Sequence, residues 1–437
     1  MRINIKDKQN FIEIFNQAFN KKINSINGIS IDSRKIKPND IFIPLIGHKN
    51  DGHKYIDDVL KKDGTICLDE KTNIINERII KTESNKKALL SMASYWREKV
   101  NSKIIAVTGS NGKTTIKDLL YHIMKSNFSC SKSIGNHNST IGLPLTFLNC
   151  KINDQYAILE MGANEDGEIK KLCESIKPNY SLITNISNAH IKNFESINHI
   201  AKCKSEIFSH LNKDGTAFIN LNDKMIQQMV IKSKKITFGI NNDKADFNGI
   251  TKKNELLING YRLKIPKNIY FLAESILAAY SICSTLGIEN NKIQASIKSF
   301  IIPSGRGTII NQKNYTIIDD TYNASPASMK FGINRFNKME SKNHKILIIG
   351  DMLELGDYKI QEHEELAEII NSKNIDIILT IGEAMHFLYK RLNKDYAYKS
   401  HFSNIEDLKK AFNSIVKKND IVFIKGSRKM KLEKVYN

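Results

Sequence analysis

Hydrophobic and polar positions along the chain alternate between short apolar runs and segments with helical periodicity. The run 104–107 is apolar and largely β-branched, which is typical of a buried strand. After it, Ile116, Leu119, Leu120 and Ile123 recur at the spacing of one helix face. Because strand-like and helix-like segments alternate in this way along the whole chain, we expect an α/β protein built on parallel sheets.

The length of 437 residues allows two or three hydrophobic cores. A polar segment at 81–87 and a cluster of turn-forming residues at 303–307 mark two expected junctions. We therefore expect domains at 1–83, 84–303 and 304–437. Further strands are predicted at 29–32, 40–45, 65–68, 156–159, 181–184, 316–319, 345–349, 375–381 and 421–424, and helices at 53–62, 88–99, 197–211 and 270–283.

Composition narrows the class of protein. Six cysteines without a Cys-x-x-Cys pair suggest the reduced thiols of a cytoplasmic protein and not a zinc site. The first residues lack the apolar core of a signal peptide, and no apolar run approaches membrane-spanning length. The net charge of +20 comes from basic residues spread over the chain, so we expect no nucleic-acid partner and an anionic small-molecule substrate instead.

The segment after the strand at 104–107 carries the strongest chemical signal, Thr-Gly-Ser-Asn-Gly-Lys-Thr-Thr at 108–115. A strand, a glycine-containing loop and a helix N-terminus together bind nucleotide phosphates, because backbone N–H groups and the helix dipole face them. The usual first glycine of such a loop would fall at Val107, and an ordinary β–α turn is the alternative. We predict ATP binding by Gly109, Ser110, Asn111, Gly112, Lys113, Thr114 and Thr115.

Two neighbouring strand ends add polar side chains to this loop. Glu160 follows the strand at 156–159, and His190 follows the strand at 181–184. Ligands of open α/β sheets bind beyond the carboxyl ends of strands, and a carboxylate with the Thr114 hydroxyl suits Mg²⁺. His190 is either a further site residue or a structural hydrogen-bonding group. Lys204 lies in the middle of an apolar helix face, so its ammonium either escapes to water or enters a site.

Three strands of the last region also end in polar segments, at 319–326, 350–356 and 425–428. Their common position at one sheet edge predicts a second half-site. In the first region, the segments 32–34 and 51–53 follow strand-like runs, and each is either a turn or a binding element.

With these motifs the chain resembles the Mur ligases, ATP-dependent amide-forming enzymes of peptidoglycan precursor synthesis. The resemblance covers essentially the whole chain. Within the family, the segments 322–326 (Tyr-Asn-Ala-Ser-Pro), 350–356 (Gly-Asp-Met-Leu-Glu-Leu-Gly) and 425–428 (Lys-Gly-Ser-Arg) resemble the members that add D-alanyl-D-alanine to UDP-N-acetylmuramoyl-tripeptide. The other segments that carry the resemblance to the Mur ligases are 32–34, 51–53, 108–115, 135–146, 160–163 and 188–190.

The resemblance implies a UDP-substrate domain, a central ATPase domain and a C-terminal Rossmann-like domain in a monomer. It implies that the reaction passes through an acyl-phosphate intermediate. The expected catalytic residues are Lys113, Glu160, His190, Lys204 and Arg306. Metal ligands would be Thr114, Glu160, His190 and a carbamylated Lys204. The C-terminal domain would contact the nucleotide through Arg306, Asp320 and Asn323. Substrate contacts would come from Asp32, Ser33, Arg34, Asn136, Asn138, Ser139, Lys425, Ser427 and Arg428.

Three positions depart from the family pattern. The segment 271–275 reads Phe-Leu-Ala-Glu-Ser, so that Ser275 replaces an asparagine expected near the adenine. Ser139 and Lys429 also replace the usual asparagine and glycine. The alternatives are another ligase of the superfamily, which adds the third peptide residue or glutamate to folate, and a nucleotide-dependent switch protein. The third residue of the tripeptide is either diaminopimelate or lysine.

Overall fold

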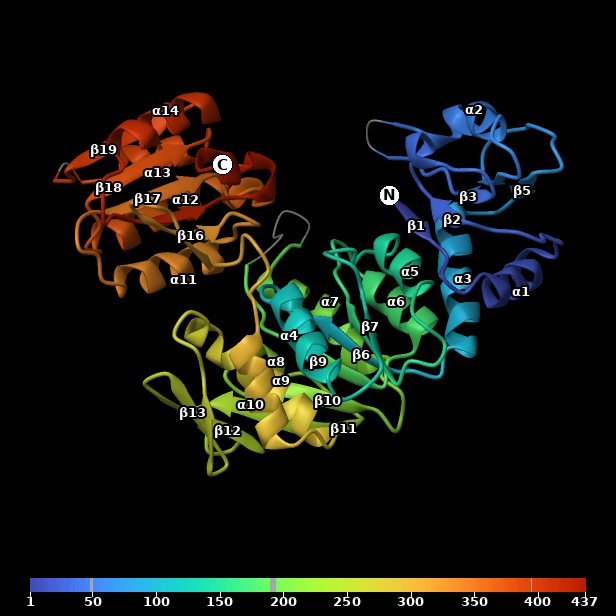
Figure 1. Cartoon of the computed structure of the whole chain (residues 1–437), viewed down its shortest axis with the longest axis horizontal. Coiled ribbons are helices and arrows are strands. Elements are labelled where there is room, and N and C mark those ends of the chain that lie inside the picture. Colours follow the sequence, from blue (N-terminus) through green and yellow to red (C-terminus); the bar gives the residue numbers. More distant parts are fainter. Residues whose placement is uncertain (48–49, 189–193, 394) are drawn as a thin grey trace.

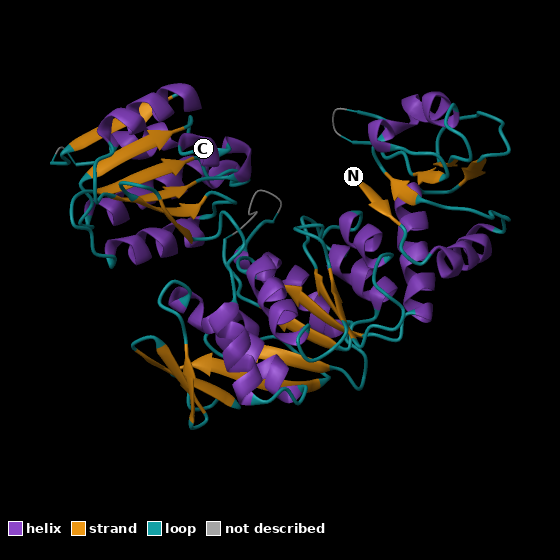
Figure 2. Cartoon of the chain, viewed as in Figure 1, coloured by secondary structure: helices purple, strands orange, loops and turns teal. Residues whose placement is uncertain are grey.

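The structure is a computed structural model that describes residues 1–47, 50–188, 194–393 and 395–437. Three lobes follow one another along the sequence, and the N-terminal and C-terminal lobes stand on opposite sides of the central one (Figure 1). Within the described residues each lobe contains one sheet, of five, nine and six strands. Helices cover these sheets (Figure 2), so the α/β class is confirmed. The domain boundaries remain predictions.

The N-terminal lobe is a small sheet in which only the first strand is antiparallel to its neighbour. The predicted helix at 53–62 is split into a 3₁₀ turn, Gly52–Tyr55, and α2. Helix α3 packs against α1 and also against helices of the central lobe, so it joins the two lobes. The elements are β1 (Arg2–Asn4), α1 (Lys8–Phe19), β2 (Gly28–Ser30), β3 (Asp40–Phe42), α2 (Ile56–Leu60), β4 (Ile66–Asp69), β5 (Ile79–Lys81) and α3 (Asn85–Lys99).

The central sheet has the order β14-β13-β12-β11-β10-β9-β6-β8-β7. It is parallel from β7 to β12, as predicted, but β13 and β14 extend it in antiparallel fashion. Asn259 and Gly260 have positive φ at the β13–β14 turn, as a tight hairpin requires. The strands are β6 (Lys103–Thr108), β7 (Cys130–Lys132), β8 (Tyr156–Glu160), β9 (Tyr180–Ile183), β10 (Thr216–Asn220), β11 (Lys234–Ile240), β12 (Phe247–Lys252), β13 (Glu255–Ile258) and β14 (Tyr261–Lys264).

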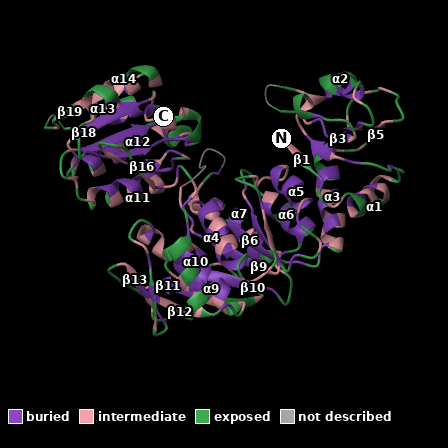
Figure 3. Cartoon of the chain, viewed as in Figure 1, coloured by how far each residue is buried: buried purple, intermediate pink, exposed green. Residues whose placement is uncertain are grey.

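Helices of the central lobe pack in two groups, and the sheet between them is buried (Figure 3). One group joins α4, α9 and α10, and the other joins α3, α5, α6 and α7. Among the described residues no helix is long and apolar enough to cross a bilayer. The helices are α4 (Lys113–Met124), α5 (Gly142–Phe147), α6 (Glu168–Ile176), α7 (Ile197–Ser209), α8 (Lys224–Gln227), α9 (Ala273–Thr285) and α10 (Asn290–Ser299).

The C-terminal sheet has the order β15-β16-β20-β17-β18-β19, with β15 antiparallel and the rest parallel. Helices α11, α12 and α13 contribute to one core, and α14 contributes to a second core. The elements are β15 (Thr308–Asn311), β16 (Thr316–Asp320), α11 (Pro326–Asn337), β17 (Lys345–Gly350), α12 (Lys359–Asn371), β18 (Ile377–Ile381), α13 (Met385–Lys390), β19 (Tyr398–Phe402), α14 (Ile405–Ile415) and β20 (Ile421–Lys425).

Candidate active site

A cavity of about 540 Å³ lies between the central and C-terminal lobes. The two lobes contribute polar and charged side chains from the ends of their strands, which is where α/β sheets bind ligands. Most of the predicted site residues meet here: Ser110, Asn111, Gly112, Lys113, Thr114, Thr115, Asn136, Asn138, Ser139, Glu160, Lys204, Arg306, Asp320, Asn323, Lys425, Ser427 and Arg428.

The phosphate loop has the backbone that its sequence predicts. Gly109 adopts a φ of +143°, and a Cβ there would lie 1.9 Å from Thr184 Oγ1, so only glycine fits. Gly112, with a φ of +79°, directly precedes the first turn of α4. Lys113 Nζ donates to the carbonyl oxygens of Gly109, at 2.6 Å, and Ser110, at 3.0 Å. Burial lowers the pKa of Lys113, whereas the nearby Glu160 carboxylate opposes that shift.

Glu160 is the last residue of β8, and its carboxylate is held on both sides. Thr114 Oγ1 donates to Glu160 Oε2 at 2.7 Å, and Asn138 Nδ2 donates to Glu160 Oε1 at 2.7 Å. The hydroxyl and carboxylate oxygens beside a phosphate loop are the donors that Mg²⁺ prefers, so these residues fit the ion. No cluster of three or more His, Cys, Asp or Glu side chains suited to a metal occurs among the described residues. His190 lies outside the described residues.

Lys204 enters this cavity from α7. Its side chain is buried, with 3% of the residue exposed, although its neighbours Lys202 and Ser205 are not buried. Burial, together with the positive charge of Lys113, lowers the pKa of Lys204 to about 7. Of the two interpretations left open by the sequence, the structure therefore favours the one in which Lys204 enters a site.

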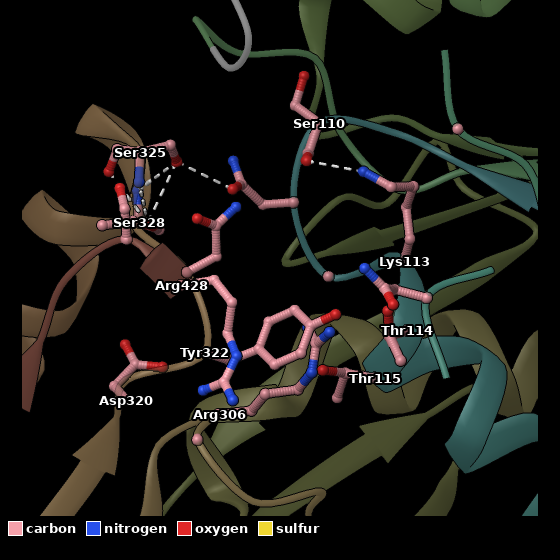
Figure 4. A pocket seen from close by; sticks show the side chains of 18 of the residues that line it. Ser110, Lys113, Thr114, Thr115, Arg306, Asp320, Tyr322, Ser325, Ser328 and Arg428 are labelled. Carbon is pink, nitrogen blue, oxygen red and sulfur yellow. Dashed lines mark hydrogen bonds between the residues drawn. The ribbon is translucent and has the colours of Figure 1, made fainter. Parts of the chain in front are cut away.

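The C-terminal lobe places further charges opposite the phosphate loop (Figure 4). The Arg306 guanidinium stacks 3.9 Å from the ring centroid of Tyr322. Lys425 Nζ forms an ion pair with Asp320 Oδ2 at 2.7 Å and donates to the carbonyl oxygen of Asn323 at 2.9 Å. Burial raises the pKa of Asp320, and the Lys425 ammonium opposes that shift.

The two lobes touch directly at this cavity. Ser325 Oγ, at the start of α11, donates to Asn111 Oδ1 of the phosphate loop at 3.0 Å. The Arg335 guanidinium lies 3.5 Å from the ring centroid of Phe271. The phosphate loop and the C-terminal strand ends therefore form one continuous site.

The N-terminal motifs do not line this cavity. Asp32 caps the 3₁₀ turn Ser33–Lys35 and pairs with Arg34 at 2.9 Å, which lowers the pKa of Asp32 to about 2. Asp51 likewise caps a turn and accepts a 2.7 Å hydrogen bond from the buried His53. The predicted substrate role of Asp32, Ser33 and Arg34 therefore stays a prediction.

Lys117 was not found from the sequence. It is buried close to Glu160 and lies four residues after Lys113 on α4, and a single lysine in a helix gives no local signal of a buried charge.

Ser275, which replaces the asparagine expected near the adenine, lines a second, smaller cavity together with Glu274, Asn111 and Gly112. It therefore lies beside the phosphate loop, and its contact with adenine stays a prediction.

Comparison with known proteins decides the family. Residues 25–99, 107–269 and 305–428 match the Mur ligase catalytic-domain, middle-domain and glutamate ligase-domain models. A Rickettsia prowazekii protein called UDP-N-acetylmuramoyl-tripeptide--D-alanyl-D-alanine ligase is 34% identical over 94% of this chain and 94% of its own. This chain belongs to the Mur ligase family. A Bacillus subtilis protein of the same name is 31% identical to this Mur ligase over 94% of this chain and 92% of its own.

Solved structures agree with that assignment. MurF from Acinetobacter baumannii shares the fold of this Mur ligase, with a TM-score of 0.86, 24% identity and 97% coverage of each chain. MurF ligase from Thermotoga maritima, solved in complex with ADP, has a TM-score of 0.82 and 27% identity over 93% of this chain and 95% of its own. The fold of this chain is thus shared with these two solved MurF structures over more than nine tenths of its length.

Proposed function

We propose that this Mur ligase adds D-alanyl-D-alanine to UDP-N-acetylmuramoyl-tripeptide, with conversion of ATP to ADP and phosphate, in peptidoglycan precursor synthesis. The observation that carries the proposal is the cavity of about 540 Å³ that joins a phosphate loop to the polar strand ends of the C-terminal lobe. Curated relatives that match nearly the whole chain carry the name of this activity, and one relative was solved with ADP.

The proposed reaction has two steps. A terminal carboxylate oxygen of the tripeptide attacks the γ-phosphorus of ATP, the bond to ADP breaks, and an acyl phosphate forms. The amine of D-alanyl-D-alanine then attacks the acyl carbon and loses a proton, and inorganic phosphate leaves. Negative charge develops on phosphoryl and carboxyl oxygens in both steps. The Lys113 and Arg306 cations line the same cavity and would stabilise that charge.

Mg²⁺ is part of the proposal, because Thr114 and Glu160 offer oxygen ligands beside the phosphate loop. When bound, the ion would neutralise charge on the phosphates. An ammonium cannot bind a cation, so Lys204 would contribute only after reaction of its neutral amine with carbon dioxide, which gives an anionic carbamate. A pKa near 7 leaves a large fraction of the amine neutral at physiological pH.

The nucleotide would be bound by both lobes, since Lys113 belongs to the central lobe, and Arg306, Asp320 and Asn323 belong to the C-terminal segment. Catalysis would therefore depend on closure of these lobes around the substrates. The Ser325–Asn111 hydrogen bond joins the two lobes at the phosphate loop. The segments 32–34 and 136–139 would face the UDP-sugar and the muramoyl peptide, and Lys425, Ser427 and Arg428 would contact substrate.

We also propose that the chain acts in the cytoplasm as a monomer. All six cysteines are free thiols, and most are buried, which fits a reducing compartment. The phosphate loop and the C-terminal residues proposed to contact the nucleotide belong to the same chain and line one cavity.

Substrate exchange tests the proposed function. Phosphate release is measured with ATP and three pairs: UDP-muramoyl-tripeptide with D-alanyl-D-alanine, UDP-muramoyl-dipeptide with a diamino acid, and folate with glutamate. We expect rapid release with the first pair only, because amide formation requires both correct partners in one cavity. Preference for another pair would assign a different ligase activity. ATP binding without release in any pair would indicate a nucleotide-dependent switch protein.

A further inference from the structure

Lys117 is a charged side chain sealed inside the central lobe. It lies on α4, four residues after Lys113, and its side chain has no solvent exposure. It is not among the described residues that line the cavity. Transfer of an ammonium into a protein interior is costly unless it gains hydrogen bonds and opposite charges. The partners of Lys117 therefore indicate why the charge is there.

The direct partner of Lys117 is a loop. Lys117 Nζ donates to the carbonyl oxygen of Gly135 at 2.6 Å. Two carboxylates lie just beyond hydrogen-bond distance, Asp118 at 3.6 Å and Glu160 at 3.9 Å. The Lys117 ammonium, which belongs to α4, thus binds the loop between β7 and α5 and lies near the Glu160 carboxylate at the end of β8.

That loop, residues 133–141, presents side chains to the cavity. Asn136, Asn138 and Ser139 all line it. Other hydrogen bonds hold the loop on either side of Gly135. Glu160 N–H donates to Ser133 Oγ at 3.0 Å, Gly162 N–H donates to the carbonyl oxygen of Asn138 at 2.8 Å, and Asn138 Nδ2 donates to Glu160 Oε1 at 2.7 Å. Gly135, at the exposed turn between them, is held by Lys117 from below.

We propose that Lys117 is a positioning residue, which anchors the loop 133–141 against the nucleotide-binding helix so that its polar side chains face the peptide substrate. The inference rests on the proposed function for the identity of that substrate. Lys117 acts through its hydrogen bond to the loop, not on the reacting atoms. Loss of the anchor should therefore weaken recognition of the peptide substrate more than binding of ATP, whose loop is formed by other residues.

The test compares Lys117→Met with Lys132→Met. Methionine keeps the length and packing of the lysine stem but removes the donor and the charge. Lys132 is a matched control, because its Nζ pairs with the same Asp118 at 2.7 Å but has no bond to Gly135. In Lys117→Met we expect the KM for UDP-muramoyl-tripeptide to rise about tenfold or more, since small displacements of positioning groups are costly. The Kd for ATP should change less than about twofold, and Lys132→Met should resemble the wild type.

A second pair of measurements separates positioning from stability. Lys117→Arg restores a charged donor and should recover part of the peptide KM. In the double variant Lys117→Met/Asn138→Ala, the KM for UDP-muramoyl-tripeptide should rise by a smaller factor than the product of the factors in the two single variants, because both changes act through one loop. An unchanged peptide KM in Lys117→Met would overturn the inference, as would equal weakening of ATP and peptide binding. Unfolding of both the Met and Arg variants would assign Lys117 to stability alone and also overturn it.

The wild-type enzyme is measured first with the same substrates. Absence of wild-type turnover would count against the proposed function. Normal wild-type turnover together with an unaffected peptide KM in Lys117→Met would count against the role of Lys117 only.

Discussion

Replacement of Lys113 with methionine is expected to abolish ligase turnover while the fold is retained. Lys113 is the first residue of α4, and its ammonium donates hydrogen bonds to two carbonyl oxygens of the phosphate loop. When phosphates occupy the loop, this ammonium is placed to exchange those carbonyls for phosphoryl oxygens, whose charge grows during transfer. Loss of such a charge in a water-poor site lowers phosphoryl-transfer rates by about 10³-fold or more.

The measurement is phosphate release with the tripeptide and D-alanyl-D-alanine, together with thermal unfolding. Methionine is a good helix former, so the melting temperature should stay close to that of the wild type. Lys125→Met is the matched control, since Lys125 is an exposed residue that follows the last turn of the same helix. A Lys113→Met enzyme with a near-normal rate would show that the phosphate loop does not serve this reaction.

Replacement of Lys204 with methionine is expected to lower turnover by about 100-fold or more, because an anionic ligand group beside the phosphate loop would be lost. Lys202→Met on the exposed side of α7 should leave turnover unchanged. Carbon-13 bicarbonate should give a carbamate signal in nuclear magnetic resonance spectra of the wild type and of Lys202→Met, but not of Lys204→Met. Full activity of Lys204→Met, or a carbamate signal that persists in it, would remove the proposed role.

The same lysine gives a pH dependence with a definite sign. In the folded protein the pKa of Lys204 is about 7, below the ordinary lysine value of 10.5, because burial disfavours the ammonium. Between these values the unfolded chain binds more protons at this site, so unfolding becomes harder as pH rises. In bicarbonate-free buffer, the stability of the wild type relative to Lys204→Met should therefore increase from pH 7 towards pH 10, as measured by urea unfolding. A constant difference would show that Lys204 is not desolvated.

Local patterns in the sequence predicted the parts of the site that form within one strand–loop–helix unit. The phosphate loop and Glu160 could be placed because each follows a short apolar strand. Lys204 was noticeable because helical spacing put a cation on an apolar face. The same reasoning missed Lys117, since its anchor is a backbone carbonyl 18 positions further along the chain.

Local sequence patterns could not predict the contacts between lobes. Neither the Ser325–Asn111 hydrogen bond nor the Arg335–Phe271 stack has a local signature, because each joins residues distant in the sequence. The antiparallel strands β13 and β14 also departed from the expected all-parallel sheet. Their Asn-Gly turn favours a hairpin, which needs no crossover helix.

The proposed reaction is tested most directly by the fate of the tripeptide's carboxylate oxygen. UDP-muramoyl-tripeptide labelled with oxygen-18 in its terminal carboxylate is incubated with the enzyme, ATP and D-alanyl-D-alanine, and the released phosphate is analysed by mass spectrometry. We predict that each amide bond formed transfers a single oxygen-18 atom to inorganic phosphate, because the acyl phosphate breaks at its acyl carbon–oxygen bond. Amide formation with unlabelled phosphate, or no amide formation at all, would contradict this chemistry.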